Sequence, residues 1–467
     1  MSERKRFHPL AILIYWVQAV RGWLFLFFIF LINGGIATLF GAIVVGIVLV
    51  LLLFFALGKY FSRSYEVTPQ KMVIYHGIIR KKETDIPYHR MQTIKQRQWF
   101  FFKPFHVTQL LIETAGGNET KAEASLPAVK EEVLRQIEAY RQGDQVEEET
   151  AETYDYQVTN GQIFLFGLTD LSILASLFAF LVLIDELIPE KWLEAATTTA
   201  ESILRVGWML TIAVSFLIIL LVAGFSLLKN FIQYYNFRVS RYQQTLTIES
   251  GLFERKTQKI PLDKIQGIRI RQQLLRKLLG ISTVELMLAG GQEVKGEGEI
   301  TKLYLLPIVK QENLYQMLGA LLPEWKMQEP DLQFVSRNSL WYFWRWNILW
   351  LPVLAGFFWF NRWAGISAVV LVLFLLLFSW FDYQYQGYAI QTKSRICIQT
   401  YELWTSVQTF VERPKVQAVT EQTTKWLYPK QIGHVKLFVK AGQGTETMQL
   451  RYIKKEAIQE IKAFYES

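Results

Sequence analysis

Cysteine and histidine are scarce in this sequence. Cys397 is the single cysteine among 467 residues, which excludes an internal disulfide framework and any zinc site built from several cysteines. The five histidines are scattered, so we expect no histidine-rich metal site and no cofactor. No Gly-Lys-Ser/Thr follows a glycine-rich stretch, and a phosphate-binding loop is therefore not predicted.

Charge is also low. Charged residues make up 19% of the chain, whereas soluble domains carry about 25%, and hydrophobic residues reach 51%. This composition is too apolar for an ordinary soluble protein and too charged for a chain that lies wholly in lipid. Fifty basic residues against 41 acidic ones give a net charge of +9. That excess suits a protein at a lipid bilayer surface, and we expect no nucleic-acid partner.

Six apolar segments approach the roughly 20 residues that a membrane-spanning helix needs. They form three pairs, and we therefore predict six transmembrane helices in three hairpins. Gln18 and Arg21 interrupt the first segment, which leaves open whether it spans the membrane fully. The segments lie at residues 10–32 and 36–57, 163–184 and 203–228, and 340–360 and 363–381.

The loop charges predict the orientation. Arg4, Lys5 and Arg6 precede the first span, whereas the connector at residues 185–201 holds five acidic residues and one lysine. The positive-inside rule then places the N-terminus, and every segment that follows an even-numbered span, in the cytoplasm. We expect a multi-pass protein of the cell (inner) membrane.

The segments after the hairpins repeat one another. In each block a glutamine follows a basic and an apolar residue, and an alanine-glycine step comes later at nearly constant spacing. The third block departs from the pattern, with Glu412 in place of the proline and Tyr401 where the others have a turn glycine. The shared motifs are Ile86-Pro87, Gln92 and Ala115-Gly116-Gly117, then Ile260-Pro261, Gln266 and Ala289-Gly290-Gly291, then Gln417 and Ala441-Gly442.

Within a block the pattern is β followed by helix. Residues 66–75 and 238–248 alternate as strands do, with glycine turns at Gly77 and Gly251. A closing helix is predicted from apolar residues at helical spacing near residues 129–140 and 453–464. Pro127 and Pro307 are expected near the first turn of the first two closing helices. Each block is long enough to form a small barrel or sandwich.

Paired spans followed by such a block resemble the YdbS-like bacterial PH domain family, and the resemblance covers nearly the whole chain. It implies membrane α-helical hairpins plus α+β domains, in which a PH-like split β-barrel with a C-terminal capping helix follows each hairpin. It also implies a companion, a smaller membrane protein with a single PH-like domain. The expected boundaries are hairpins at 10–58, 161–230 and 338–382, PH-like domains at 59–141, 231–326 and 383–467, and a linker at 142–160.

Two groups of residues are candidates for membrane contact. The first is the aromatic stretch at residues 99–105, in which Trp99, Phe101 and Phe102 either form one buried helix face or rest among lipid headgroups. The second comprises basic residues that could meet anionic headgroups, namely Arg80, Lys81, Lys82, Arg255 and Lys256.

Three charged residues lie in or at the ends of the first member of each hairpin: Arg21, Asp170 and Arg345. Charge inside a bilayer is costly and therefore often functional. One interpretation is interfacial snorkelling by the arginines and a helix-terminal role for Asp170. The other is a polar track between spans, as in a transporter. We favour the first, because no discontinuous helix pair with facing acidic residues is present.

The sequence shows no catalytic constellation, and we do not expect an enzyme. The interpretation it favours is a non-enzymatic membrane scaffold in envelope maintenance or defence. Its cytoplasmic PH-like domains would bind a protein partner and could also bind lipid headgroups. The partner would be the smaller single-domain relative or a second copy of this chain. The alternative is transport or efflux of a lipid or membrane-active peptide through the helix bundle.

Overall fold

A computed structural model describes residues 4–32, 38–77, 81–114, 124–142, 154–170, 208–288, 294–295, 299–300, 302–352, 354, 356, 361–402, 404–442 and 444–466. Contacts divide the chain into two compact units, Met1–Ile260 and Pro261–Ser467. Within the described residues, three helices are long and apolar enough to cross a membrane, at Ala11–Phe30, Leu39–Phe61 and Gly365–Gln384. The expected six spans are therefore only partly visible, and most of the third predicted segment and the start of the fourth lie outside the described residues.

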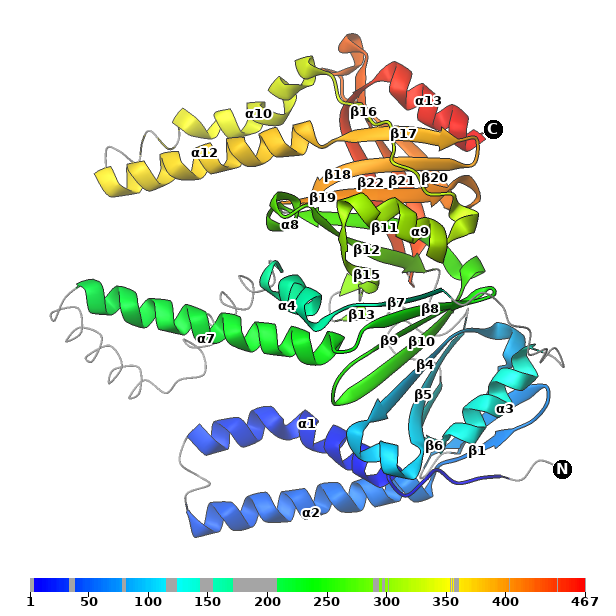
Figure 1. The fold of residues 1–467 in the computed structure, drawn as a ribbon. Helices are drawn as coiled ribbons and strands as arrows, with labels where there is room; N and C mark the ends of the chain where they lie inside the picture. Colours follow the sequence, from blue (N-terminus) through cyan, green and yellow to red (C-terminus); the bar gives the residue numbers. More distant parts are fainter. Residues whose placement is uncertain are drawn as a thin grey trace. The chain divides into compact units, whose positions relative to one another are not determined.

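The first unit holds two helical hairpins and the strands that follow them (Figure 1). Helix α1 packs on α2, and α4 packs on α7. The elements are α1 (Ala11–Ile32), α2 (Leu39–Phe61), β1 (Ser64–Val67), β2 (Lys71–His76), β3 (Lys82–Pro87), β4 (Met91–Trp99), η3 (Phe100–Phe105), β5 (Val107–Thr114), β6 (Ala124–Lys130), α3 (Glu131–Gln142), β7 (Tyr154–Gln157), α4 (Asn160–Leu168), α7 (Trp208–Tyr234), β8 (Arg238–Tyr242), β9 (Thr245–Ser250) and β10 (Glu254–Pro261).

The second unit begins with the second half of block two, continues with a hairpin in which α10 packs on α12, and ends with block three (Figure 1). Its main elements are β11 (Ile265–Gln273), α8 (Leu274–Leu278), β12 (Ile281–Leu288), β13 (Val294–Lys295), β14 (Glu299–Ile300), β15 (Leu303–Lys310), α9 (Leu314–Leu321), β16 (Gln333–Phe334), α10 (Leu340–Ile348), α12 (Arg362–Gln384), β17 (Gly387–Thr392), β18 (Arg395–Glu402), β19 (Thr405–Glu412), β20 (Val416–Gln422), η9 (Tyr428–Lys430), β21 (Ile432–Ala441), β22 (Gly444–Lys454) and α13 (Lys455–Glu466).

Each block is divided between two sheets, and neighbouring blocks share a sheet. In the first unit one sheet has the order β6-β5-β4-β10-β9-β8-β7, so that the second half of block one joins the first half of block two. In the second unit the order β15-β12-β11-β19-β18-β17-β16 joins the second half of block two to the first half of block three in the same way (Figure 1). Three separate barrels were expected. The sequence does not predict that neighbouring blocks share a sheet, because edge strands of similar composition can pair within a block or between blocks.

The halves of blocks one and three nevertheless enclose common cores. In block one, Met72 and Ile86 from the first sheet pack with Leu110 and Ile112 from the second, and Ile137 of α3 closes the core. In block three the corresponding residues come from β18, β19, β21, β22 and α13. This arrangement matches the predicted split barrel with a capping helix.

The repeated glutamine marks a β-bulge. Pairing with the next strand skips one residue between Met91 and Thr93, between Ile265 and Gly267, and again between Val416 and Ala418. The skipped residues are Gln92, Gln266 and Gln417. The motif seen in the sequence is therefore a structural device that bends the first strand of each second half.

Several local predictions were wrong. Residues 66–75 and 238–248 each form two strands, because a turn at Pro69-Gln70 or at Gln243, which has a φ of 47°, interrupts them. Pro127 and Pro307 lie inside β6 and β15, which are the edge strands of their sheets and tolerate a residue without an N–H donor. The predicted linker contains β7, which pairs with β8.

The third block departs less than its sequence suggests. The register of β11 with β19 matches that of β4 with β10. This match makes Glu402, and not Tyr401, the residue of block three that is equivalent to Gly251 of block two. Cys397 is buried in β18, as expected for a packing residue, and burial raises the pKa of its thiol.

Candidate functional site

In each block a short helical segment follows the bulged strand, and it places apolar side chains beside the hairpins. In block one, η3 supplies Phe105, whose ring centroid lies 6.0 Å from that of His8. Phe105 and the start of α1 line an open hollow together with Leu53 of α2. The segment therefore lies against the ends of α1 and α2 from which the chain enters and leaves the first hairpin.

The next block adds a second apolar element to this surface in the first unit. The Phe100 N–H donates to the Phe253 carbonyl at 2.8 Å, and the two rings lie 6.2 Å apart. Phe253 is in the β9–β10 turn, which is held to the end of α7 because Leu252 N–H donates to the Ile232 carbonyl. Phe100 and Phe253 remain 59% and 52% exposed. Exposed aromatic side chains thus gather where α7 ends.

The second unit repeats this contact. The Leu274 N–H of α8 donates to the Trp404 carbonyl at 3.0 Å, at the positions that correspond to Phe100 and Phe253. The Trp404 ring lies within 6 Å of three rings on one face of α12, those of Phe374, Phe378 and Phe381. Phe374 stands ten residues before the end of α12, about 15 Å along its axis. The β18–β19 turn therefore runs alongside the part of α12 that is apolar enough to span a membrane.

The second unit has further exposed apolar residues in its short helical segments and beside them. Leu278 of α8 is 78% exposed, and Trp426, just before η9, is 82% exposed. We call the two sets, one in each unit, the hairpin-proximal residues: Phe100, Phe105, Leu252 and Phe253 in the first unit, and Leu275, Leu278, Trp404, Trp426 and Tyr428 in the second. All of them except the half-buried Trp404 are exposed. Large exposed apolar residues at repeated positions indicate a surface that contacts lipid or protein.

Basic side chains accompany this surface. Lys59 and Arg63 lie over the ring of Tyr15 at the base of the first hairpin, and Lys277 lies over Tyr385 at the end of α12. Lys430 lies over Tyr342 of α10. Burial lowers the pKa of Lys277, a residue of α8. Aromatic residues mixed with lysine and arginine are typical of the membrane-water boundary.

The predicted membrane contacts are distributed unevenly. Phe102 is fully buried in the core of block one, so it cannot contact lipid, and this part of the prediction was wrong. The short helical segment turns Phe100 and Phe105 outward instead. Trp99 and Phe101 are half-buried and stack on each other at 6.0 Å. Phe100 and Phe105 lie within the predicted stretch, but Phe253 and Trp404 were missed; the apolar pair Leu252-Phe253 after a turn glycine was the available signal.

The predicted basic residues differ in their partners. Arg255 is half-buried and bonds Glu249 at 2.5 Å, and Lys256 lies 3.8 Å from Glu254. Both belong to β10 inside the shared sheet. Lys81 and Lys82 are exposed, and Arg80 lies outside the described residues. The role of all five in binding headgroups stays a prediction.

The three charged residues near the spans lie in different settings. Arg21 is exposed on α1. Asp170 follows the end of α4 at Leu168, so the predicted third span is interrupted there. Arg345 on α10 lies over the rings of Tyr342, Trp346 and Tyr452. In its own unit Arg345 therefore packs against block three.

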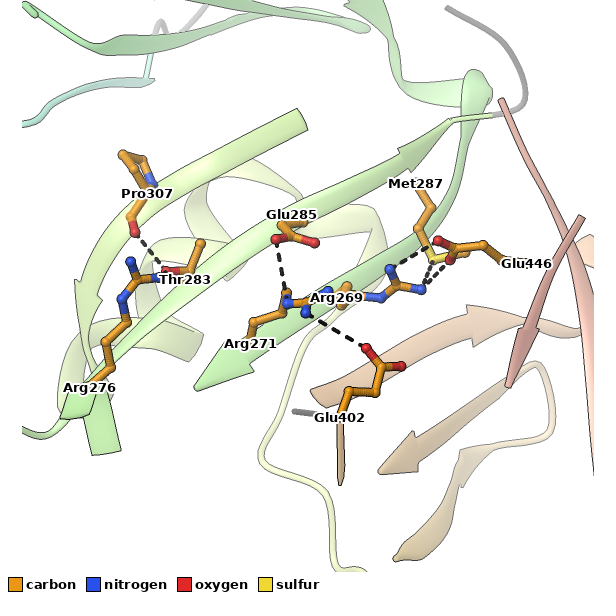
Figure 2. Close-up of polar contacts among 9 residues, drawn as sticks. All are labelled: Arg269, Arg271, Arg276, Thr283, Glu285, Met287, Pro307, Glu402 and Glu446. Atoms are coloured by element: carbon orange, nitrogen blue, oxygen red, sulfur yellow. Dashed lines mark hydrogen bonds and ion pairs between the residues drawn. The ribbon is translucent and has the colours of Figure 1, made fainter. Parts of the chain in front are cut away.

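A charged cluster holds the shared sheet of the second unit together (Figure 2). Arg271 on β11 lies 3.7 Å from both Glu285 on β12 and Glu402 on β18. Arg269, on the same face, pairs with Glu446 on β22. Burial alone would lower the pKa of Arg269, but the neighbouring carboxylates outweigh it and raise that pKa. The cluster therefore links the second half of block two to both sheets of block three.

A buried arginine stands beside this cluster. Arg276 of α8 donates to the Thr283 hydroxyl at 2.5 Å, and that hydroxyl donates to the Pro307 carbonyl at 2.8 Å (Figure 2). The bond from Arg276 to Thr283 fixes α8, which carries the exposed Leu278, on the sheet. Among the described residues, no group of three or more His, Cys, Asp or Glu side chains could hold a metal ion.

Comparisons with known proteins agree with the repeat. A family model described as "Bacterial PH domain" matches the chain three times, at residues 12–144, 191–321 and 347–467. The UPF0699 transmembrane protein YdbT of Bacillus subtilis (strain 168) is 28% identical over 419 residues, which cover 84% of each of the two chains. No solved structure matches. The resemblance inferred from the motifs is thereby confirmed.

Proposed function

Because this chain belongs to the bacterial PH domain family and is a membrane protein, we propose that it is a non-enzymatic scaffold. Its PH-like blocks rest on the bilayer surface and offer their remaining faces to a protein partner. The partner is a smaller membrane protein with a single PH-like domain or a second copy of this chain. The three blocks face the cytoplasm, and six spans in three pairs anchor them in the cell membrane.

The hairpin-proximal residues of the two units are the observation that carries this proposal. The contact between Phe100 and Phe253 recurs between Leu274 and Trp404, and in each case it joins two neighbouring blocks next to a hairpin helix. In each unit the same residues would therefore connect neighbouring blocks and approach the bilayer. Buried apolar area and attraction between basic residues and anionic lipids would act together there.

A depth measurement tests the proposal. A fluorophore is attached at Phe253→Cys or at Gln70→Cys, in full-length protein that carries Cys397→Ser and is reconstituted in anionic nanodiscs. Gln70 is an exposed control at the β1–β2 turn, which lies beyond the strand that leaves α2. Lipids with a spin label at the headgroup should quench the dye at position 253 strongly and the dye at position 70 weakly. Equal quenching at both positions would contradict contact with the membrane.

A further inference from the structure

One strand of the first block and one strand of the third block, which we call the end strands, have one neighbour each among the described strands. β3 of block one pairs only with β2, and β20 of block three pairs only with β21. The counterparts in block two are both paired on their outer side, β10 with β4 and β11 with β19. These strands thus have a partner from an adjacent block wherever the chain provides one.

The two internal junctions have the same register. Ile94 faces Lys259 in one, and Ile268 faces Phe410 in the other, at equivalent positions of the repeats. The match continues to the far ends, where Trp99 faces Glu254 and Gln273 faces Thr405. Applied to the two end strands, this register would place Thr420 of β20 opposite Thr84 of β3.

Burial distinguishes the paired strands from the end strands. Asp85 on β3 is exposed, whereas its counterpart Phe410 on β19 is buried. Thr420 on β20 is also exposed, whereas its counterpart Arg269 on β11 is largely buried. An unpaired edge presents free N–H and C=O groups, and it is a ready template for pairing with another chain.

Charge does not prevent this pairing. Charged edge strands often discourage association, yet β10 carries Arg255, Lys256 and Lys259 and is paired. Its Lys256 faces Arg97, and Glu254 lies 3.8 Å from both. At the end strands the register would set Glu421 against Glu83.

A lysine of a neighbouring element pairs with a carboxylate on each end strand. Lys462 of α13 bonds Glu421, and Lys71 of β2 bonds Asp85. An internal junction already holds such an arrangement, because Lys256 and Arg97 face each other there and Glu254 lies beside both.

We propose that copies of this chain assemble head to tail, with β20 of one copy pairing antiparallel with β3 of a second copy and Thr420 facing Thr84. The chain contains this junction twice, and its two ends carry the two missing halves. Such a contact joins two different surfaces, so it either closes into a ring or continues as an open array. The inference rests on the proposed scaffold function and names the partner as a second copy, recognised through main-chain hydrogen bonds.

Disulfide trapping between two tagged copies tests the pairing. Both copies carry Cys397→Ser and are produced together in membranes, one with Thr420→Cys and the other with Thr84→Cys. Oxidation should yield a disulfide-linked product that contains both tags. Moving one cysteine to Gln422→Cys shifts the register by two residues, about 7 Å along the strand, and this variant should lose most of the product.

A second measurement separates this inference from the proposed function. A photo-reactive amino acid at Thr420 of the full-length protein should link to residues 82–87 of another copy, as identified by mass spectrometry. Linkage only to a different membrane protein would overturn self-assembly and leave the scaffold function standing. Absence of any disulfide product and of any photo-product would overturn the head-to-tail contact.

Discussion

Arg269 on β11 and Glu446 on β22 form a two-pronged ion pair, in which Nη1 lies 3.1 Å from Oε1 and Nη2 bonds Oε2 (Figure 2). The guanidinium also contacts Sδ of Met287 at 3.8 Å. Both side chains are mostly buried. Because the residues belong to different blocks, this pair ties the end of block two to the final sheet of block three.

Loss of Arg269 should destabilise the second unit. Arg269→Met leaves the Glu446 carboxylate half-buried without its main partner, which should cost about 2 kcal/mol of unfolding free energy. Thermal unfolding of the detergent-solubilised chain, in a double-mutant cycle with Glu446→Gln, measures the coupling. Lys462→Met is the control, because its pair with Glu421 is more exposed and should contribute roughly 0–1 kcal/mol. A cycle without coupling between positions 269 and 446 would refute the role of this pair.

Gly267 should be indispensable at the same junction. A β-carbon at this position would lie 3.0 Å from the Phe410 carbonyl oxygen and 3.2 Å from Sδ of Met287. Gly267→Val should therefore push β19 away from β11 and lower the thermal midpoint. Gly319→Ala on α9 meets nothing within 4 Å and should raise stability by about 0.5–1 kcal/mol, because alanine is the better helix former. The idea fails if the valine variant is as stable as the natural chain.

The orientation can be tested by labelling. Cysteines at the exposed turn residues Gln70, Gln244 and Lys393, one in each block, should resist a membrane-impermeant thiol reagent in intact cells. A cysteine at Thr198, in the acidic connector, should react. The physical reason is the excess of basic residues on the block side of the spans. Protection of position 198 with labelling of the other three would show the inverse topology.

Much of the architecture follows from local patterns in the sequence. The spacing around Gln92, Gln266 and Gln417 revealed the repeat, because a bulge requires the same backbone course in each block. The strand after each bulge and the closing helices follow from the periods of 2 and 3.6. Turns were harder, since Gln243 adopts a positive φ that no sequence rule assigns to glutamine.

The partner of each strand could not be predicted. β4 has β3 of its own block and β10 of the next block as candidate partners, and both are polar, alternating and end in Ile-Pro. The choice depends on the packing of whole blocks. The same reason explains why Phe253 and Trp404 were missed, because their importance depends on helices far away in the sequence.

Strand sharing between blocks is the central claim, and cross-linking of β4 tests it directly. Gln96 on β4 faces Thr257 on β10, whereas in a self-contained barrel it would face Glu83 on β3, the counterpart of Thr257. Residues directly opposite on antiparallel strands lie within disulfide reach. In full-length protein with Cys397→Ser, mild oxidation should link Gln96→Cys to Thr257→Cys within one chain and leave Gln96→Cys with Glu83→Cys reduced. The opposite result, a bond between positions 96 and 83 and none between 96 and 257, would contradict the account.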